Sequence, residues 1–208
     1  GRILIPTARA GVTITGLDGS AAMLARCRSK LDAEPAAVQA RVRLEPGDMR
    51  AFELGTTFSL ITAPFRVVQH LITTQDQLRF LAAVARHLAP HGRLVFDVFN
   101  PRFDMLIGAD GEEHEDTANQ VLPDGRSLRR TYRIGRVRWL DQVNEAELIY
   151  YVGNQRHVQA FEMRWYLRAE LEHLLARAGF YVRQIYGDFK RGPVVDGCPD
   201  LLVVAALD

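Results

Sequence analysis

The sequence predicts an α/β fold with a doubly wound, mostly parallel sheet, an antiparallel last strand and a three-stranded antiparallel insertion. Apolar runs typical of strands alternate with segments of helical period over residues 1–99, a pattern that indicates parallel strands covered by helices. Three further strand patterns follow, joined by turns too short for crossovers, so we expect antiparallel pairing there. The final two strand patterns flank a loop rich in glycine and proline, which excludes a helical crossover between them.

The first elements surround an aspartate. Gly1 has the character of the end of a glycine-rich turn, and Pro6 lacks an N–H, so the first helix starts no earlier than about residue 2. The β-branched run 12–15 predicts a strand that leads to Asp18. Ser20 is a suitable N-cap for the next helix. The predicted apolar face of that helix comprises Met23, Leu24, Cys27 and Leu31.

Two more strands and a helix follow. A short strand around residues 42–45 ends at Pro46-Gly47-Asp48, and residues 58–63 form a strand that Pro64 terminates. Thr74 begins a sequence with capping-box spacing, and residues 94–99 predict a buried strand. The predicted apolar stripe of the intervening helix comprises Leu78, Leu81, Ala82, Ala85 and Leu88.

After residue 101 the pattern changes. The acidic stretch 110–116 predicts a solvated loop, and strands are expected over residues 129–137, 143–152 and 158–165. We interpret residues of about 102–165 as a lid inserted into a single domain spanning residues 1–208. A helix over residues 167–178, ended by Gly179, and strands over residues 180–186 and 201–207 complete the chain.

The bulk properties exclude several classes of protein. The 208 residues suffice for one domain with its own core. The formal net charge is +1 and the arginines are dispersed, so we expect no nucleic-acid partner. Cys27 and Cys198 form no C-x-x-C pair, so we expect neither a metal site nor a disulfide, and a cytoplasmic location fits best. No apolar run approaches the roughly 18–20 residues that span a bilayer.

Asp18 is the first candidate ligand-binding residue. It lies where the second strand of an open α/β sheet would end, immediately before a helix. A carboxylate at that point can accept hydrogen bonds from both hydroxyls of a ribose. Since nicotinamide dinucleotides use the same arrangement, an NAD(P)-dependent oxidoreductase stays open on this feature alone.

Several segments together carry a resemblance to a known family. They are Gly16-Leu17-Asp18-Gly19-Ser20, Gly47-Asp48-Met49, Phe96-Asp97-Val98-Phe99-Asn100-Pro101, Ala178-Gly179-Phe180 and the closing apolar strand. With this pattern the chain resembles the class I S-adenosylmethionine (SAM) dependent methyltransferases, which have a Rossmann-like sheet. The likeness covers nearly the whole chain. Gly1 would match the last glycine of the family's first turn, so we expect the natural protein to be longer by about 40 residues.

The resemblance also implies roles for individual residues. Asp18 and Ser20 would hold the SAM ribose, and Asp48 would accept a hydrogen bond from the adenine amino group. Met49 would cover the adenine ring, and Met23 could pack on its opposite side. At the end of the fourth strand, the Ala63 carbonyl would hold the methionine amino group, and Phe65 would line the pocket of the methyl donor.

The acceptor is expected to be a small molecule methylated at nitrogen or oxygen. The sequence Ala63-Pro64-Phe65 differs from the N-P-P-Y or D-P-P-Y motif of enzymes that methylate exocyclic amines of nucleic-acid bases. His70 is the preferred candidate for a catalytic base and His157 a weaker one. One or two aromatic residues of the insertion could cap the acceptor. These aromatic residues are Tyr132, Trp139, Tyr150, Tyr151, Trp165 and Tyr166.

The antiparallel last strand favours the methyltransferase over the oxidoreductase, because that family inserts its last strand beside the fifth. A third hypothesis is a non-enzymatic module that uses a methyltransferase-like fold for binding or dimerisation. A homodimer is possible under any of these hypotheses.

Overall fold

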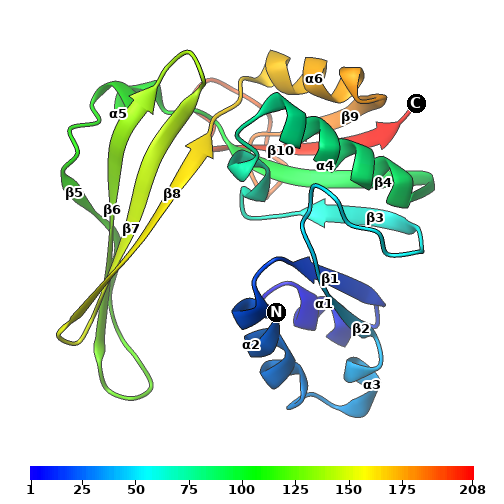
Figure 1. Ribbon diagram of the computed structural model, residues 1–208, viewed down its shortest axis with the longest axis horizontal. Coiled ribbons are helices and arrows are strands. Elements are labelled where there is room, and N and C mark those ends of the chain that lie inside the picture. Colours follow the sequence, from blue (N-terminus) through cyan, green and yellow to red (C-terminus); the bar gives the residue numbers. More distant parts are fainter. The chain divides into compact units, whose positions relative to one another are not determined.

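The computed structural model describes residues 1–208 and has the predicted α/β class, but its strands form three separate sheets and not one mostly parallel sheet with an insertion. The chain forms two compact units (Figure 1). The first comprises residues 1–56 and 79–87, and the second comprises residues 57–78 and 88–208. No helix is both long enough and apolar enough to cross a membrane.

The first unit is built on two parallel strands. Strand β1 pairs with β2 in a register that places Ile14 opposite Val42 and Asp18 opposite Pro46. Leu4, Ile5, Cys27 and Leu31 form the buried cluster of this unit, and apolar side chains of both strands pack against it. The elements are α1 (Leu4–Arg9), β1 (Ile14–Asp18), α2 (Ala21–Leu31), α3 (Ala36–Gln39) and β2 (Val42–Pro46).

Two local features of this unit explain why the sequence folds this way. The Ser20 hydroxyl accepts a hydrogen bond from the Met23 N–H at 3.3 Å, which confirms Ser20 as the N-cap of α2. Gly16 lies where α1 crosses β1, and a Cβ at this position would approach Leu4 Cδ1 to 2.5 Å. A larger residue at this position would therefore require the end of the Leu4 side chain to move, and glycine avoids this rearrangement.

The second unit contains a mixed sheet in the order β3-β4-β10-β9. Strands β3 and β4 are parallel, whereas β10 is antiparallel to both β4 and β9. The prediction that the last strand is antiparallel and lies beside the strand of residues 94–99 is therefore confirmed. The bounds are β3 (Phe58–Ala63), β4 (Leu88–Phe99), β9 (Phe180–Tyr186) and β10 (Asp200–Leu207).

The helix after β3 differs in detail from the prediction. Helix α4 (Thr74–His87) is capped by Thr73, whose hydroxyl accepts the Asp76 N–H at 3.1 Å, so the cap lies one residue before the expected Thr74. Ala82 of the predicted stripe is exposed. The other predicted positions are correct in part, because Leu81 and Leu88 are buried and Leu78 and Ala85 are half-buried. The buried side chains of α4 are Gln77, Phe80, Leu81, Ala83, Val84 and His87.

The lid contains four antiparallel strands and not three, in the order β5-β6-β7-β8 (Figure 1). The predicted acidic loop is wrong from residue 113 onward, where β5 begins. Glu115 forms an ion pair of 2.7 Å with Arg129 of β6, and Asp116 pairs with Arg130. Such cross-strand pairs stabilise a charged strand that composition alone would assign to a loop. The lid strands are β5 (Glu113–Val121), β6 (Ser127–Arg138), β7 (Val143–Val152) and β8 (Gln155–Arg164).

Three short helices lie between these strands along the chain. They are η1 (Val67–His70), α5 (Phe103–Ile107) and α6 (Arg168–Arg177). Helix α6 packs against β9 and ends before Gly179, whose φ of 80° is left-handed. Glycine adopts this conformation at no steric cost, which is why it follows the last helical turn.

Candidate functional site

In the first unit, the candidate residues gather at the carboxyl ends of β1 and β2. The Gly47 N–H donates to the Asp18 carbonyl oxygen at 3.2 Å, so the two strand ends are held together. Asp18 Oδ1 accepts the Ser20 N–H at 2.8 Å, which fixes the carboxylate. Its second oxygen accepts no hydrogen bond from the chain and is therefore available to a ligand hydroxyl.

Asp48 lies two residues beyond β2 and is exposed. Its Oδ1 accepts the Arg50 N–H at 2.9 Å, and its Oδ2 lies 2.6 Å from Arg50 Nη2. These bonds from Arg50 lower the pKa of Asp48 to about 2. The carboxylate is therefore an ionised acceptor at neutral pH, but much of its hydrogen-bonding capacity is taken by Arg50.

The other candidates of this unit are a glycine and two methionines. Met23 has 55% of its surface exposed, so it is not part of the core that its helical spacing suggested as an alternative. Met49 is half-buried in the turn after β2. A Cβ on Gly1 would lie 3.0 Å from Cys27 Sγ, so the chain at Gly1 runs close to α2.

In the second unit, the candidates lie at the carboxyl end of β3. Ala63 is buried as the last residue of the strand, and Phe65 is 50% exposed. Phe65 and Arg66 both have left-handed backbone angles, with φ of 63° and 59°. The turn therefore projects Phe65 outward at the edge where ligands bind in open α/β sheets.

His70 lies at the end of η1, against the lid. Its Nδ1 is 3.2 Å from the Glu162 carbonyl oxygen of β8, and its ring meets Phe161 edge-on with centroids 5.7 Å apart. A carbonyl can only accept, so Nδ1 carries a proton, and in the neutral ring the lone pair lies on Nε2. The side chain is exposed and has the tautomer that a general base requires.

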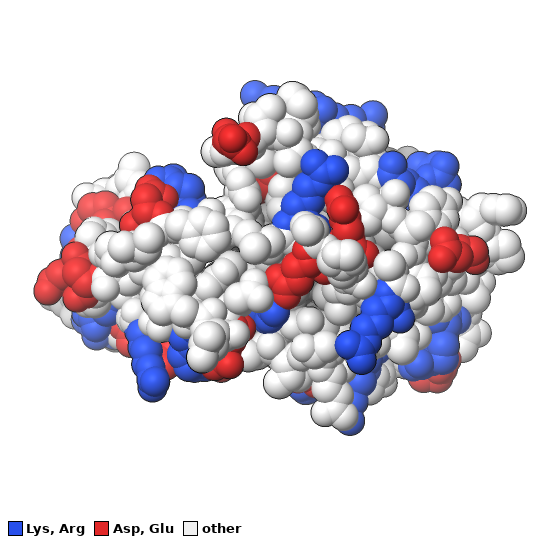
Figure 2. Space-filling model, turned by 90° about the horizontal axis from the view of Figure 1, so that it is seen from above, with Lys and Arg blue, Asp and Glu red and all other residues white.

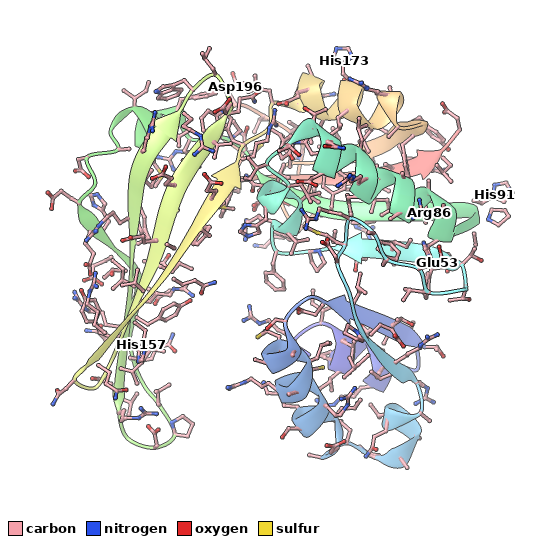
Figure 3. All side chains as sticks on the ribbon, viewed as in Figure 1. Glu53, Arg86, His91, His157, His173 and Asp196 are labelled. Carbon is pink, nitrogen blue, oxygen red and sulfur yellow. The ribbon has the colours of Figure 1, made fainter.

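His157 is placed differently. It lies on β8 close to the Gly153-Asn154 turn of the lid (Figure 3). Four residues separate it from Phe161, which corresponds to about 13 Å along a strand. His157 and His70 therefore cannot act on one acceptor atom together.

The aromatic residues of the lid are engaged in packing. Trp139 and Trp165 meet edge-on at 5.7 Å, and the Tyr132 ring packs against His114 with centroids 5.5 Å apart. Tyr151 donates its hydroxyl hydrogen to Glu113 at 2.7 Å. Figure 2 shows positive and negative side chains mixed over one face of the molecule, with no field of a single sign.

Sequence reasoning missed the residues that fix η1. Gln69 donates to the Arg164 carbonyl at 2.9 Å and accepts the Phe99 N–H at 2.9 Å, so it connects β8 with β4. The buried Tyr166 hydroxyl lies 3.3 Å from the carbonyl oxygens of Val68 and Leu71, and burial raises its pKa. These partners are distant in sequence, and no local pattern could have identified them.

A buried charged cluster was also missed. Arg66 Nη2 lies 2.8 Å from Asp200 Oδ1, and its Nε lies 3.9 Å from Asp97 Oδ2. Burial raises the pKa of Asp97, an effect that the charge of Arg66 opposes. The available signal was Asp97 itself, because an isolated carboxylate within a buried apolar strand is rare without a partner.

Comparisons with known proteins agree with this geometry. The sequence model of a family described as "Methyltransferase domain" matches residues 1–92. Among curated proteins, the chain is 36% identical over 115 residues to a dTDP-3-amino-3,4,6-trideoxy-alpha-D-glucopyranose N,N-dimethyltransferase of Streptomyces venezuelae. The match covers 55% of this chain and 43% of that protein, so it spans less than half of the relative's length.

Two solved structures extend the likeness. The CcbJ methyltransferase from Streptomyces caelestis has a TM-score of 0.81 at 22% identity, over all of this chain and 79% of its own. The second is SAM-bound CalS10, an amino pentose methyltransferase from Micromonospora echinaspora. It has a TM-score of 0.67 at 30% identity, over 93% of this chain and 73% of its own.

Proposed function

The chain belongs to the class I SAM-dependent methyltransferase family, and from this premise we propose that it transfers a methyl group from SAM to a small-molecule acceptor. The observation that carries the proposal is the Asp18 turn. A carboxylate fixed by the Ser20 N–H at 2.8 Å leaves one oxygen free at the end of a parallel strand, which suits a ribose diol. The proposed cofactor residues are Gly1, Asp18, Ser20, Met23, Asp48, Met49, Ala63 and Phe65.

The proposed acceptor atom is the nitrogen of an amino group, most simply one carried by a sugar ring. Two similar proteins support this choice by their names, one an aminosugar N,N-dimethyltransferase and the other an amino pentose methyltransferase. The lid supports it as well, because Trp139 keeps 47% of its surface exposed beside its contact with Trp165, and an exposed ring can offer a face to the apolar side of a sugar or to a cation. A hydroxyl oxygen is the alternative acceptor atom.

The proposed mechanism assigns proton transfer to His70. When bound, SAM supplies an electrophilic methyl group on a sulfonium. An amine is protonated at neutral pH and must lose a proton before its lone pair can react. In the neutral ring, donation from Nδ1 to the Glu162 carbonyl leaves the lone pair on Nε2, so neutral His70 can take that proton. The strand ends supply alignment, which contributes strongly to a displacement of this kind.

The proposal predicts that the full-length protein binds S-adenosylhomocysteine and that Asp18→Ala weakens this binding at least tenfold, because the ribose loses its acceptor. Calorimetric titration measures both affinities. Asp32→Ala is the matched control, since Asp32 is an exposed carboxylate at the other end of α2 and should leave the affinity unchanged. Binding of NAD in place of S-adenosylhomocysteine, or equal losses in both variants, would contradict the proposed function.

A further inference from the structure

The contact that orients His70 joins two parts of the second unit that share no strand ladder. His70 lies in η1, which follows β3, whereas its partner, the Glu162 carbonyl oxygen, belongs to β8 of the lid. The lid strands form a sheet of their own, separate from β3, β4, β9 and β10. Strand pairing therefore does not hold the Glu162 oxygen against His70, and side chains must do so.

The free edge of β8 is where these side chains bind. Strand β8 lies at an edge of the lid sheet, so one side of its backbone has no neighbouring strand. Backbone groups of residues i and i+2 point to the same side of a strand, as do the carbonyl groups of Glu162 and Arg164. His70 Nδ1 lies 3.2 Å from the first oxygen, and Gln69 Nε2 donates to the second at 2.9 Å. Two consecutive side chains of η1 therefore take the place of a further strand at this end of β8.

Gln69 is suited to this position because its amide is a donor at one end and an acceptor at the other. While its Nε2 donates to the Arg164 carbonyl, its Oε1 accepts the N–H of Phe99, the last residue of β4, at 2.9 Å. The side chain is only 2% exposed, so water competes little for either bond. A carboxylate of the same shape would set a second acceptor against the Arg164 carbonyl oxygen. The bridge between β4 and β8 therefore requires an amide.

Tyr166 secures η1 from the same side. It follows the lid in sequence, and its buried hydroxyl lies 3.3 Å from the carbonyl oxygens of Val68 and Leu71. This contact joins η1 to the chain just after β8, but it does not reach β4. Gln69 bonds to both β8 and β4, so its loss would release the lid from the end of the sheet.

We propose that Gln69 is a positioning residue for His70: it seats the lid on η1, and the seated lid fixes the tautomer of His70 through the Glu162 carbonyl. This inference rests on the proposed function for its effect on catalysis. Its structural part, the dependence of the His70 tautomer on Gln69, can be measured without donor or acceptor.

The first experiment measures the NMR chemical shifts of both ring nitrogens of His70 in the isotope-labelled full-length protein, without ligands. At a pH of about 8.5 imidazole is neutral, and the natural protein should carry the proton on Nδ1. In Gln69→Glu the shifts should move to those of a ring that exchanges between both tautomers. Gln39→Glu is the matched control, because Gln39 Nε2 donates to the Glu34 carbonyl at 2.7 Å within the first unit. It should leave the His70 shifts unchanged.

The second experiment tests whether Gln69 acts through His70. Gln69→Glu should lower kcat for an amine acceptor about tenfold, with the Kd for S-adenosylhomocysteine within twofold of the natural value. In a His70→Gln background the same substitution should lower kcat less than twofold, because the group that it positions is already absent. Gln39→Glu should change kcat less than twofold in either background. Circular dichroism and thermal unfolding establish that each variant is folded.

The outcomes separate this inference from the proposed function. Absence of S-adenosylhomocysteine binding by the natural protein would reject the function, while the His70 shifts would still test the role of Gln69. Unchanged shifts in folded Gln69→Glu, a proton on Nε2 in the natural protein, or equal kcat losses in both backgrounds would each overturn the inference. If Gln69→Glu does not fold, Gln69→Met decides by the same shifts, since it removes both polar ends but keeps an unbranched apolar side chain.

Discussion

At the scale of single residues, one backbone carbonyl determines what His70 can do. The Glu162 oxygen lies 3.2 Å from Nδ1 and therefore selects the tautomer with a free Nε2. The sequence identified His70 as a candidate from its place after the fourth strand of the pattern, but the tautomer depends on a strand more than ninety residues away. The local sequence identifies the residue type, but the tautomer of the ring depends on a contact that exists only in the folded chain.

We predict that His70→Gln lowers kcat about 100-fold at neutral pH with an amine acceptor, the lower range for loss of a general base. The Kd for S-adenosylhomocysteine should not change, since the donor does not need the base. The loss should shrink as pH rises, because the acceptor then loses its proton unaided. Steady-state kinetics across pH check this prediction. His173→Gln is the control, since His173 is an exposed residue of α6 (Figure 3) with no assigned role. A pH-independent loss would contradict the role.

A second residue-scale prediction concerns Asp48 and the stability of the fold. The folded-state pKa of about 2 lies below the ordinary 3.8, so the Arg50 contact stabilises the fold above pH 4 and this contribution fades as pH falls toward 2. Because the pair is exposed, we expect Asp48→Asn to lower the free energy of unfolding by only about 0.5 kcal/mol at pH 7. Urea denaturation at pH 7 and pH 3 measures the difference. A deficit that is equally large at both pH values would argue against the ion pair as its source.

At the scale of elements, helix and strand limits were predictable where one chemical feature dominates. Pro64 terminates β3 at the expected residue, and Ser20 caps α2 as expected. The predicted boundary was wrong where two neighbouring residues are equally suitable as a helix cap. Thr73 and Thr74 are both threonines in front of α4, and only the backbone angles select Thr73, with φ of −91° and ψ of 147°. The loop prediction was wrong for residues 113–116 because the arginines that stabilise β5 lie on β6, outside the local sequence.

The capping of α4 gives a direct test at this scale. Thr73→Ala removes the hydroxyl that accepts the Asp76 N–H at 3.1 Å, so the free energy of unfolding should fall by about 1 kcal/mol. Thr74→Ala is the matched control, because residue 74 is already helical and alanine is the better helix former. Its stability should be equal or slightly higher. Chemical denaturation of both variants decides, and a reversal of their order would place the cap at Thr74.

At the scale of the whole molecule, the sequence predicted the α/β class, the antiparallel last strand and the family, because alternation of elements and turn chemistry are local properties. It did not predict how the lid attaches to the sheet. Gln69 and Tyr166 make that attachment through backbone carbonyls of other elements. A carbonyl is present at every residue, so no sequence pattern marks the ones that serve as partners.

The hydrogen bonding of the lid has a consequence for how such proteins diversify. Strands β5 to β8 form a sheet of their own and share no ladder with β3, β4, β9 or β10. The lid leaves the chain after Asn100 and returns at Tyr166, so a different lid can be joined at these two points while the ladders among β3, β4, β9 and β10 stay intact. If the proposed roles hold, recombination at these two joints exchanges the acceptor-binding part of the protein and leaves the proposed donor-binding residues unchanged.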